Sequence, residues 1–436
     1  MTRPSTLAAI AFLCASGVCA SQDISSAPRG AIFGATVDNS FRDRLDVNTA
    51  LSGGLDSEVP AELRQRVPQT GPQSGGYSSM LIVSADYARE RRGGSITAQG
   101  FTALQYYPGF GGAVSRTHSA GVGATLRTSS VSTLEIGQTA DYSPSYFYRL
   151  FPSVTPPGIG EPGPAAPDYR VDETQSFANS TQLRFRTGRQ SGNRISASVE
   201  HSATEFSGGT PRTDLDTLAW RASFARGVSR TGTFSIEYEY RTGEFGYGAQ
   251  GTEQRLRFGA NYSPALSLTR RAQLRFNLAP SAIEIPASAT SVAATGTLYK
   301  MEGDGAIAYP FLRSWTVGGS YRRGLEYIAV LRDPVFRDAA RAELEGLVTE
   351  RVDLSASAGY VTGASVLQQD DEHFDTYTGT VRGRYSVNRS LAVYAEYLYY
   401  YYNLRGQAAL APDLPSVFEQ HGIRLGLMLW ARPLSR

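Results

Sequence analysis

Apolar residues take every second position in two short runs, 258–262 and 272–278, and a turn at 263–267 separates them. Alternation with a period of two is typical of a β-strand that has one apolar and one polar face. Two such runs around a compact turn predict an antiparallel hairpin. A similar motif, with an aromatic residue, a short turn and a serine, recurs at 309–315 and 385–391. The pattern therefore predicts a chain built of hairpins.

The same alternation predicts about eighteen strands, within a range of about 16–18, between residues 45 and 432. Besides the hairpin above, strands are expected at residues 45–51, 77–87, 96–106, 122–126, 134–148, 177–185, 195–199, 218–224, 234–240, 299–309, 315–331, 336–348, 354–361, 377–385, 391–402 and 423–429. Roughly every second connection is a tight turn, and the others are longer and polar or rich in Pro and Gly. The longest, 151–169, contains too many prolines to join a ladder of hydrogen bonds.

This sorting of connections decides the fold class. Short periplasmic turns opposite longer extracellular loops are expected of a transmembrane, antiparallel, up-and-down β-barrel. A soluble β-sandwich gives no reason for such sorting. The sequence therefore predicts an all-β chain whose barrel covers residues 45–432 and whose proline-rich segment 152–168 is an extracellular loop or a plug.

Charged residues support this prediction, because they are confined to one face of a strand. Glu237 and Glu239, for example, alternate with Ile236 and Tyr238. An Arg or Lys on the lipid face near the bilayer midplane costs about 2–4 kcal/mol, so the charged face is expected to line a wet lumen. The candidate pore-lining residues are Arg184, Arg186, Arg221, Arg255, Arg257, Arg322, Arg382, Arg384, Glu237, Glu239 and Glu396.

Tyrosine is concentrated near the end of one expected strand. Residues 394–402 contain Tyr394, Tyr397 and four consecutive tyrosines at 399–402. Because a tyrosine ring has an apolar body and a polar tip, such residues favour the headgroup level of a membrane, and we interpret them as part of an aromatic girdle. Ordinary β-propensity is the alternative explanation for each single residue.

Composition adds few constraints. Mean hydropathy is −0.26 over 436 residues, and no stretch beyond the first twenty residues approaches the length of a transmembrane helix. Counts of 25 Tyr and 45 Gly suit strands and turns. A net charge of +2 indicates no attraction to nucleic acid.

The first twenty residues have the pattern of a secretory signal peptide. Arg3 precedes an apolar core at 7–18, and small residues predict cleavage near Ala20. Both cysteines, Cys14 and Cys19, lie in this segment. Lipid modification of Cys19 is the alternative, but the preceding residue is a valine, which is unfavourable there. Residues 21–44 would then be a periplasmic lead-in.

With these features assembled, the chain resembles the bacterial outer-membrane β-barrel proteins, and more narrowly the uncharacterised β-barrel porin families of Gram-negative bacteria. The resemblance lies in the phrases at 261–268 and 384–391 and in the alternating strand at 422–430. It implies a location in the bacterial outer membrane, with lipid, lipopolysaccharide and the barrel-assembly machinery as partners. Such barrels usually end on an aromatic residue, whereas this chain continues for six residues past Trp430.

No constellation typical of catalysis or metal binding accompanies the strands. The four histidines, His118, His201, His373 and His421, are scattered without ligand spacing, so neither a metal site nor a cofactor is expected. His201 has Glu200 and Ser202 beside it, but adjacent residues of a strand point to opposite faces, and an enzyme is not predicted. The acidic run 370–372 is interpreted as a solvated loop, with a Ca²⁺ site as the alternative.

Two functions remain. The first is a passive, porin-like channel for small hydrophilic solutes, with a mild preference for anions or acidic saccharides because positive candidates outnumber negative ones. The second is a non-conducting or export barrel for polysaccharide secretion or envelope assembly, in which residues 152–168 act as a plug or meet a partner.

Overall fold

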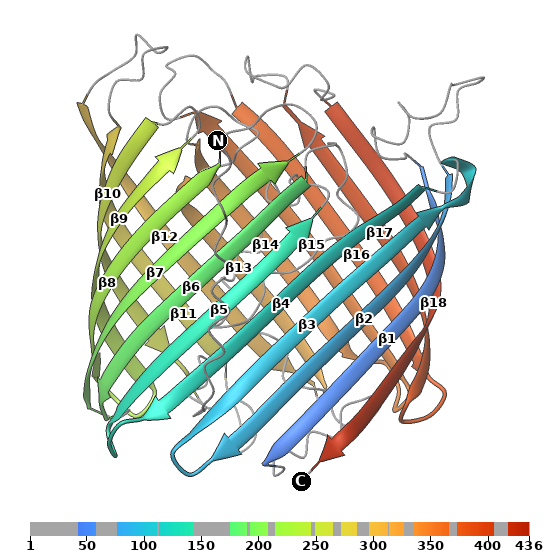
Figure 1. The fold of residues 1–436 in the computed structure, drawn as a ribbon, viewed down its shortest axis with the longest axis horizontal. Coiled ribbons are helices and arrows are strands. Elements are labelled where there is room, and N and C mark those ends of the chain that lie inside the picture. Colours follow the sequence, from blue (N-terminus) through green and yellow to red (C-terminus); the bar gives the residue numbers. More distant parts are fainter. Residues whose placement is uncertain are drawn as a thin grey trace, which may run out of the picture.

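Eighteen antiparallel strands form a single sheet that closes on itself (Figure 1). The computed structural model describes residues 42–57, 76–110, 113–143, 175–189, 192–207, 214–245, 249–264, 272–285, 296–312, 314–326, 335–365, 373–404 and 417–435. The strands are β1 (Asp43–Asp56), β2 (Gly76–Arg91), β3 (Gly94–Tyr107), β4 (Ala113–Arg127), β5 (Ser132–Ser143), β6 (Gln175–Gly188), β7 (Asn193–Ser207), β8 (Leu215–Gly227), β9 (Gly232–Phe245), β10 (Ala249–Tyr262), β11 (Gln273–Ile285), β12 (Gly296–Phe311), β13 (Trp315–Glu326), β14 (Val335–Leu347), β15 (Val352–Ser365), β16 (His373–Ser386), β17 (Leu391–Asn403) and β18 (Val417–Ser435). A single 3₁₀ turn, η1 (Pro108–Phe110), follows β3 in the described part of the chain.

Each strand pairs with its neighbours in sequence, and β1 also pairs with β18, which closes the barrel. Leu51 of β1, for instance, lies between Leu81 of β2 and Leu427 of β18. The predicted hairpin is present, with Phe258 opposite Leu278 and Ala260 opposite Phe276. The prediction of an all-β, up-and-down barrel of eighteen strands is therefore confirmed.

Most strands are longer than the alternation indicated, and each has between 12 and 19 residues. β1 begins at Asp43, two residues before the expected start, and β18 runs to Ser435, three residues past the expected end of the barrel at 432. The ladder continues there because its hydrogen bonds join backbone groups, whereas alternation marks only the stretch with an apolar face. The expected ends of the fifth and thirteenth strands, at 148 and 331, lie outside the described residues. No helix in the described ranges is long and apolar enough to cross a membrane.

Four of the short turns share one local structure. In the turns after β4, β8, β14 and β16, the side-chain oxygen of Ser129, Ser229, Thr349 or Asn388 accepts a hydrogen bond from the backbone N–H two residues later, at 2.8–3.2 Å. Such local side-chain acceptors favour turns over continued strands. These turns gather at one end of the barrel, the lower end in Figure 1, and the strand ends that the longer connections join lie at the other end. We call these the turn end and the loop end.

At residue 188, at the turn end of β6, the backbone conformation requires a glycine. Its φ is +118°, and a Cβ there would lie 2.1 Å from the carbonyl oxygen of Asn193. An L-residue rarely adopts this conformation, so glycine allows the chain to reverse direction between β6 and β7.

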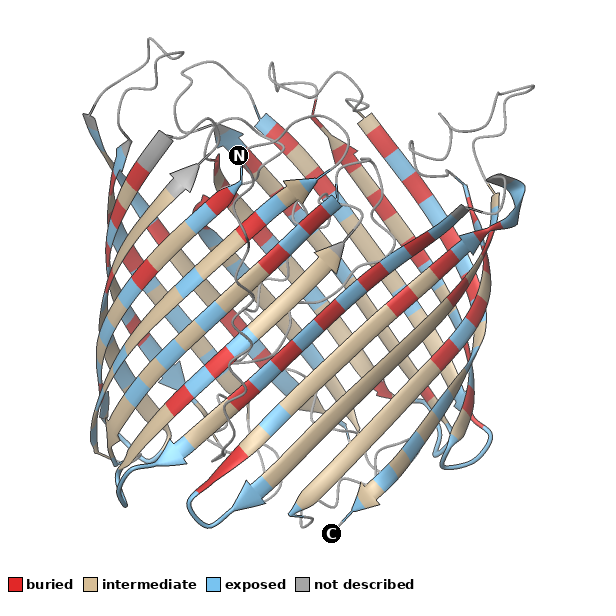
Figure 2. Cartoon of the chain, in the orientation of Figure 1, coloured by how far each residue is buried: buried red, intermediate tan, exposed pale blue. Residues whose placement is uncertain are grey.

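Exposed and buried residues alternate along the strands, as Figure 2 shows. On β18, Ile423, Leu425 and Leu427 are between 49% and 63% exposed, whereas Arg424 is 2% exposed. Side chains diverge on the convex outside of a closed sheet and converge on the concave inside, where they cover one another. The apolar face is therefore the outer surface and the charged face is the inner wall, which is the arrangement of a transmembrane barrel.

The aromatic prediction needs a correction at residues 394–402. Tyr394, Tyr400 and Tyr402 are at most 5% exposed and belong to the inner wall, since Tyr394 lies opposite Arg384 in the register. Tyr397, 40% exposed, is on the outer surface. A run of consecutive tyrosines on a strand must divide between both faces, so only every second one can contribute to a girdle.

Candidate functional site

The inner wall is the candidate functional surface. The register places all eleven predicted pore-lining residues on it, because each has exposed apolar or aromatic neighbours on the opposite face of its strand. Arg184, for example, lies between the exposed Leu183 and Phe185. They occupy strands β6, β8, β9, β10, β13, β16 and β17.

Several of these residues meet in one group, which we call the central charge cluster. Its members are Glu200, Arg221, Glu239, Arg241, Glu253, Arg255 and Glu302. Arg221 on β8 contacts Glu200 on β7 at 2.6 Å and Glu239 on β9 at 3.3 Å. Arg241 contacts Glu239 at 3.1 Å and Glu253 at 3.3 Å. The cluster is thus a continuous chain of ion pairs across neighbouring strands.

Arg255 is the centre of this cluster. Its side chain is 4% exposed and contacts Glu253 at 2.5 Å, Glu302 at 2.8 Å and Glu239 at 3.4 Å. A charge so well buried is stable only when it is paired and hydrogen-bonded. The three carboxylates fulfil that requirement, and they in turn depend on the guanidinium group.

The contact between Arg255 and Glu302 crosses an intervening strand. Arg255 belongs to β10 and Glu302 to β12, while β11 lies between them with Ala279 and Ser281 on the inner wall. Two strand spacings amount to about 9.6 Å, which only two long side chains can bridge. The small residues of β11 leave the room for this bridge.

Other candidates form smaller groups. The carboxylate of Glu135 on β5 forms ion pairs with Arg184 at 3.6 Å and with Arg186 at 3.3 Å. Arg257 pairs with Glu237 at 3.0 Å. In each case the two partners lie on adjacent strands.

On another part of the wall, Arg384 contacts Asp353 through two nitrogen atoms, each at 2.7 Å. Glu396 lies opposite both Arg382 and Arg424 in the register. Arg322 and Arg382 differ from the other candidate arginines, because neither has a carboxylate within 4.0 Å among the described residues.

The acidic residues that neutralise these arginines were not predicted from the sequence. The main ones are Glu135, Glu200, Glu253, Glu302 and Asp353. A signal for them was present, since Glu135 alternates with Leu134 and Ile136 as Glu237 does with its apolar neighbours. In the central charge cluster four glutamates face three arginines. The number of arginines alone therefore does not determine whether the net charge of the inner wall is positive or negative.

The histidines are not part of this surface. His201 contacts Asp216 at 3.1 Å, and both residues lie on the outer side, away from Ser202 on the inner wall. No group of three or more potential metal ligands occurs in the described ranges. The signal segment 1–20, the proline-rich segment 152–168 and the acidic run 370–372 lie outside the described residues.

A closed barrel of eighteen strands, apolar outside and charged inside, defines the class of the protein. It is a transmembrane β-barrel of porin-like architecture. Eight strands enclose only enough room for side chains, whereas 16–18 strands enclose an aqueous channel.

The chain is similar in structure to several solved barrels. Crystal structures of Pseudomonas aeruginosa OpdQ (11% identity, TM-score 0.45) and OccK7, also called OpdD (12% identity, TM-score 0.44), each match 90% of this chain, and the match covers 98% and 99% of those chains. Acinetobacter baumannii OccAB3 has 10% identity and a TM-score of 0.43, over 89% of this chain and 99% of the other. No known family matches the sequence, and no curated protein matches it. At such identities and TM-scores, what this protein does has to be inferred from its own barrel.

Proposed function

We propose that the protein is a passive channel for small hydrophilic solutes, with a mild preference for anions or acidic saccharides. The observation that supports this proposal is the network of charged residues on the inner wall of an eighteen-stranded barrel. A wall of this kind favours water and polar solutes over apolar ones. No feature of the described wall resembles a catalytic arrangement.

The preference for anions depends on Arg322 and Arg382. The other candidate arginines share their charge with carboxylates, whereas these two have none within 4.0 Å in the described part of the wall. Both are half-buried, so water and solutes reach them. A positive charge on a pore wall that no carboxylate contacts directly raises the local concentration of anions.

Single-channel recording in planar bilayers with a KCl gradient tests both parts of this proposal. We expect stepwise conductance and a reversal potential on the anion-selective side. The double variant R322Q/R382Q should shift the reversal potential toward cations, while R226Q, which removes an exposed charge from the outer surface of β8, should not. A cation-selective wild type contradicts the preference, and a barrel that never conducts contradicts the channel itself.

The second candidate is a non-conducting or export barrel for polysaccharide secretion or envelope assembly. It is favoured by the length of the connection between β5 and β6, which contains the proline-rich segment 152–168. Deletion of residues 152–168 separates the two functions. Conductance that appears only after the deletion indicates a plug, whereas equal conductance favours the open channel. Liposome swelling with sugars of graded size then measures the width.

A further inference from the structure

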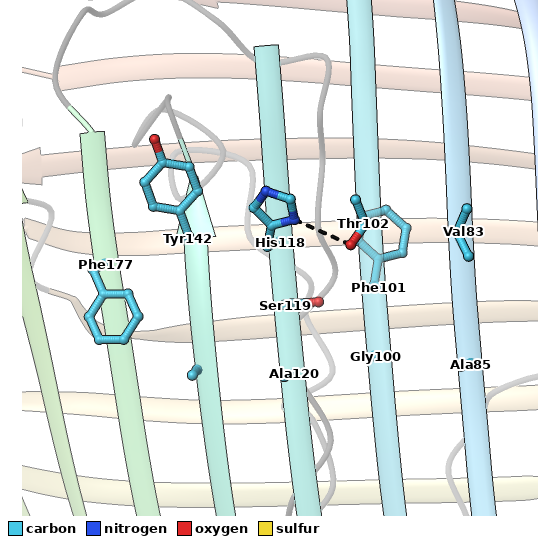
Figure 3. A pocket seen from close by; sticks show the side chains of 11 residues that line it. Val83, Ala85, Gly100, Phe101, Thr102, His118, Ser119, Ala120, Tyr142 and Phe177 are labelled. Carbon is cyan, nitrogen blue, oxygen red and sulfur yellow. Dashed lines mark hydrogen bonds between the residues drawn. The ribbon is translucent and has the colours of Figure 1, made fainter. Parts of the chain in front are cut away.

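A hollow of about 500 Å³ lies on the outer surface of the barrel, over β2 to β6 (Figure 3). Its floor is a row of small residues that are direct neighbours across four strands: Ala85, Gly100, Ala120 and Ala140. No side chain rises from this row, which explains the hollow. Because the outer surface of a transmembrane barrel borders lipid, an apolar hollow there is accessible to an acyl chain.

The next row toward the loop end is different. It consists of Val83, Thr102, His118 and Tyr142, again as cross-strand neighbours. Thr102 Oγ1 and His118 Nδ1 are 3.2 Å apart, and the His118 and Tyr142 rings stack with centroids 5.9 Å apart. The hollow therefore has an apolar floor and a polar rim on its loop-end side.

The rim has polar groups that nothing in the described chain satisfies. The Nε2 atom of His118 and the hydroxyl of Tyr142 have no hydrogen-bond partner among the described residues. Arg116 lies two residues nearer the loop end on the same face of β4, is exposed, and forms no ion pair within the described ranges. Unsatisfied donors at the border of a membrane are costly unless a ligand or water meets them.

A second polar group borders the hollow on β5 and β6. Gln138 Nε2 donates to Asn179 Oδ1 at 2.7 Å, and Thr181 donates to Gln138 at 3.1 Å, all on the outer surface. The strands are inclined to the barrel axis, so the β6 side of each row lies nearer the loop end (Figure 1). Asn179 lies opposite Ala140 in the row of the floor, and Gln138 and Thr181 lie opposite each other one row nearer the turn end, so this polar group borders the β6 side of the floor.

We infer that this hollow binds one phosphorylated glycolipid of the outer leaflet, of the lipid A type. An acyl chain lies along the small-residue row, a phosphate group meets Arg116 and His118, and sugar hydroxyls meet the rim. The polarity of the site matches such a lipid, with apolar contact at one end and a cation at the other. The loop end faces the outer leaflet, where this lipid resides. The inference does not depend on whether the pore conducts.

Native mass spectrometry of the detergent-solubilised protein, titrated with purified lipid A, tests this inference. We expect one lipid A to bind the wild type. A120L fills the floor, and its affinity should fall about tenfold, the loss expected when about two methylene contacts are displaced. A340L is the matched control: Ala340 is also exposed on the outer surface, seven residues from the turn end of β14 as Ala120 is from that of β4. Its affinity should equal that of the wild type.

The charge is tested separately with R116Q. This variant should lose about threefold in affinity for lipid A, as expected for one exposed charge contact, and its binding should depend less on ionic strength. Dephosphorylated lipid A should bind R116Q and the wild type equally, and R226Q should behave as the wild type. Equal losses in A120L and A340L, or equal binding of phosphatidylethanolamine and lipid A to the wild type, would overturn the inference. The conductance of A120L should equal that of the wild type, so a failure of the lipid-binding inference and a failure of the channel proposal can be told apart.

Discussion

Replacement of Arg255 by methionine is the most direct test of the central charge cluster. Methionine keeps much of the volume of the side chain and removes only the guanidinium group. Three carboxylates, those of Glu239, Glu253 and Glu302, then face one another without the charge that now lies 2.5–3.4 Å from each of them. The matched control is R257M, two residues along the same face of β10.

The structure predicts very different losses for these two variants. Arg255 is 4% exposed, and removal of one partner from a buried ion pair costs about 3–5 kcal/mol. Glu302 would be left buried without a cation within 4.0 Å in the described part of the wall, whereas Glu239 and Glu253 would keep Arg241. Arg257 is 29% exposed and pairs with Glu237 alone. A pair that water reaches contributes about 1 kcal/mol or less. We therefore expect R255M to lose at least about 2 kcal/mol more than R257M.

The measurement is a urea titration of the protein folded into lipid vesicles. The folded fraction is followed by the gel mobility of the unheated sample and by tryptophan fluorescence, and the free energy of unfolding is extrapolated to zero urea. The triple variant R255M/E253Q/E302Q serves as a third point. Because it removes the charge of Glu302, which R255M leaves without a cation, together with that of Glu253, it should recover most of the stability that R255M loses.

Two results would refute this reasoning. Equal losses in R255M and R257M would mean that Arg255 is in contact with water in the membrane-embedded barrel. A triple variant no more stable than R255M would mean that the loss comes from packing rather than from unpaired charge.

Two further predictions concern the turn end of the barrel and the inner and outer faces of its strands. G188A should destabilise the barrel by about 1–3 kcal/mol in the same titration, because an alanine would be strained at a φ of +118°. G192A should leave the stability unchanged, because the nearest atom would be 3.8 Å from the new Cβ. L427R places a charge on the lipid face of β18 and should cost about 2–4 kcal/mol, whereas M428R, one residue later on the inner wall, should cost much less. Equal costs at residues 427 and 428 would contradict the assignment of inner and outer faces.

The expectation that charges are confined to the inner face was too general, since Arg116 and Arg226 lie on the outer surface. The sequence was sufficient to predict the hairpins, the number of strands and the alternation of an apolar with a polar face. These properties follow from alternation, which is local. The strand ends were predicted less well, because the ladder of β1 continues through Asp43 and that of β18 through Ser435 regardless of which side chains follow. The four tyrosines at 399–402 were assigned to one girdle although alternation divides them between two faces.

Partners across the sheet could not be predicted, because they depend on the register of several strands at once. Alternation places Arg255 and Glu302 on the same face, yet nothing local indicates that two residues 47 positions apart approach within 2.8 Å across β11. The arginines therefore suggested a positive wall, and the structure shows most of them neutralised. Among the predicted candidates, Arg322 and Arg382 are the two that have no carboxylate within 4.0 Å in the described part of the chain.

The hollow on the outer surface also depends on the register of several strands and could not be predicted from any one of them. Ala85, Gly100, Ala120 and Ala140 belong to four strands, and each is an ordinary small residue in its own segment. They become a site only when the register aligns them in one row beneath Thr102, His118 and Tyr142. A shift of any one strand by two residues would preserve its alternation and its faces but would fill the hollow with a larger side chain. The register thus carries information on ligand binding that alternation alone does not contain.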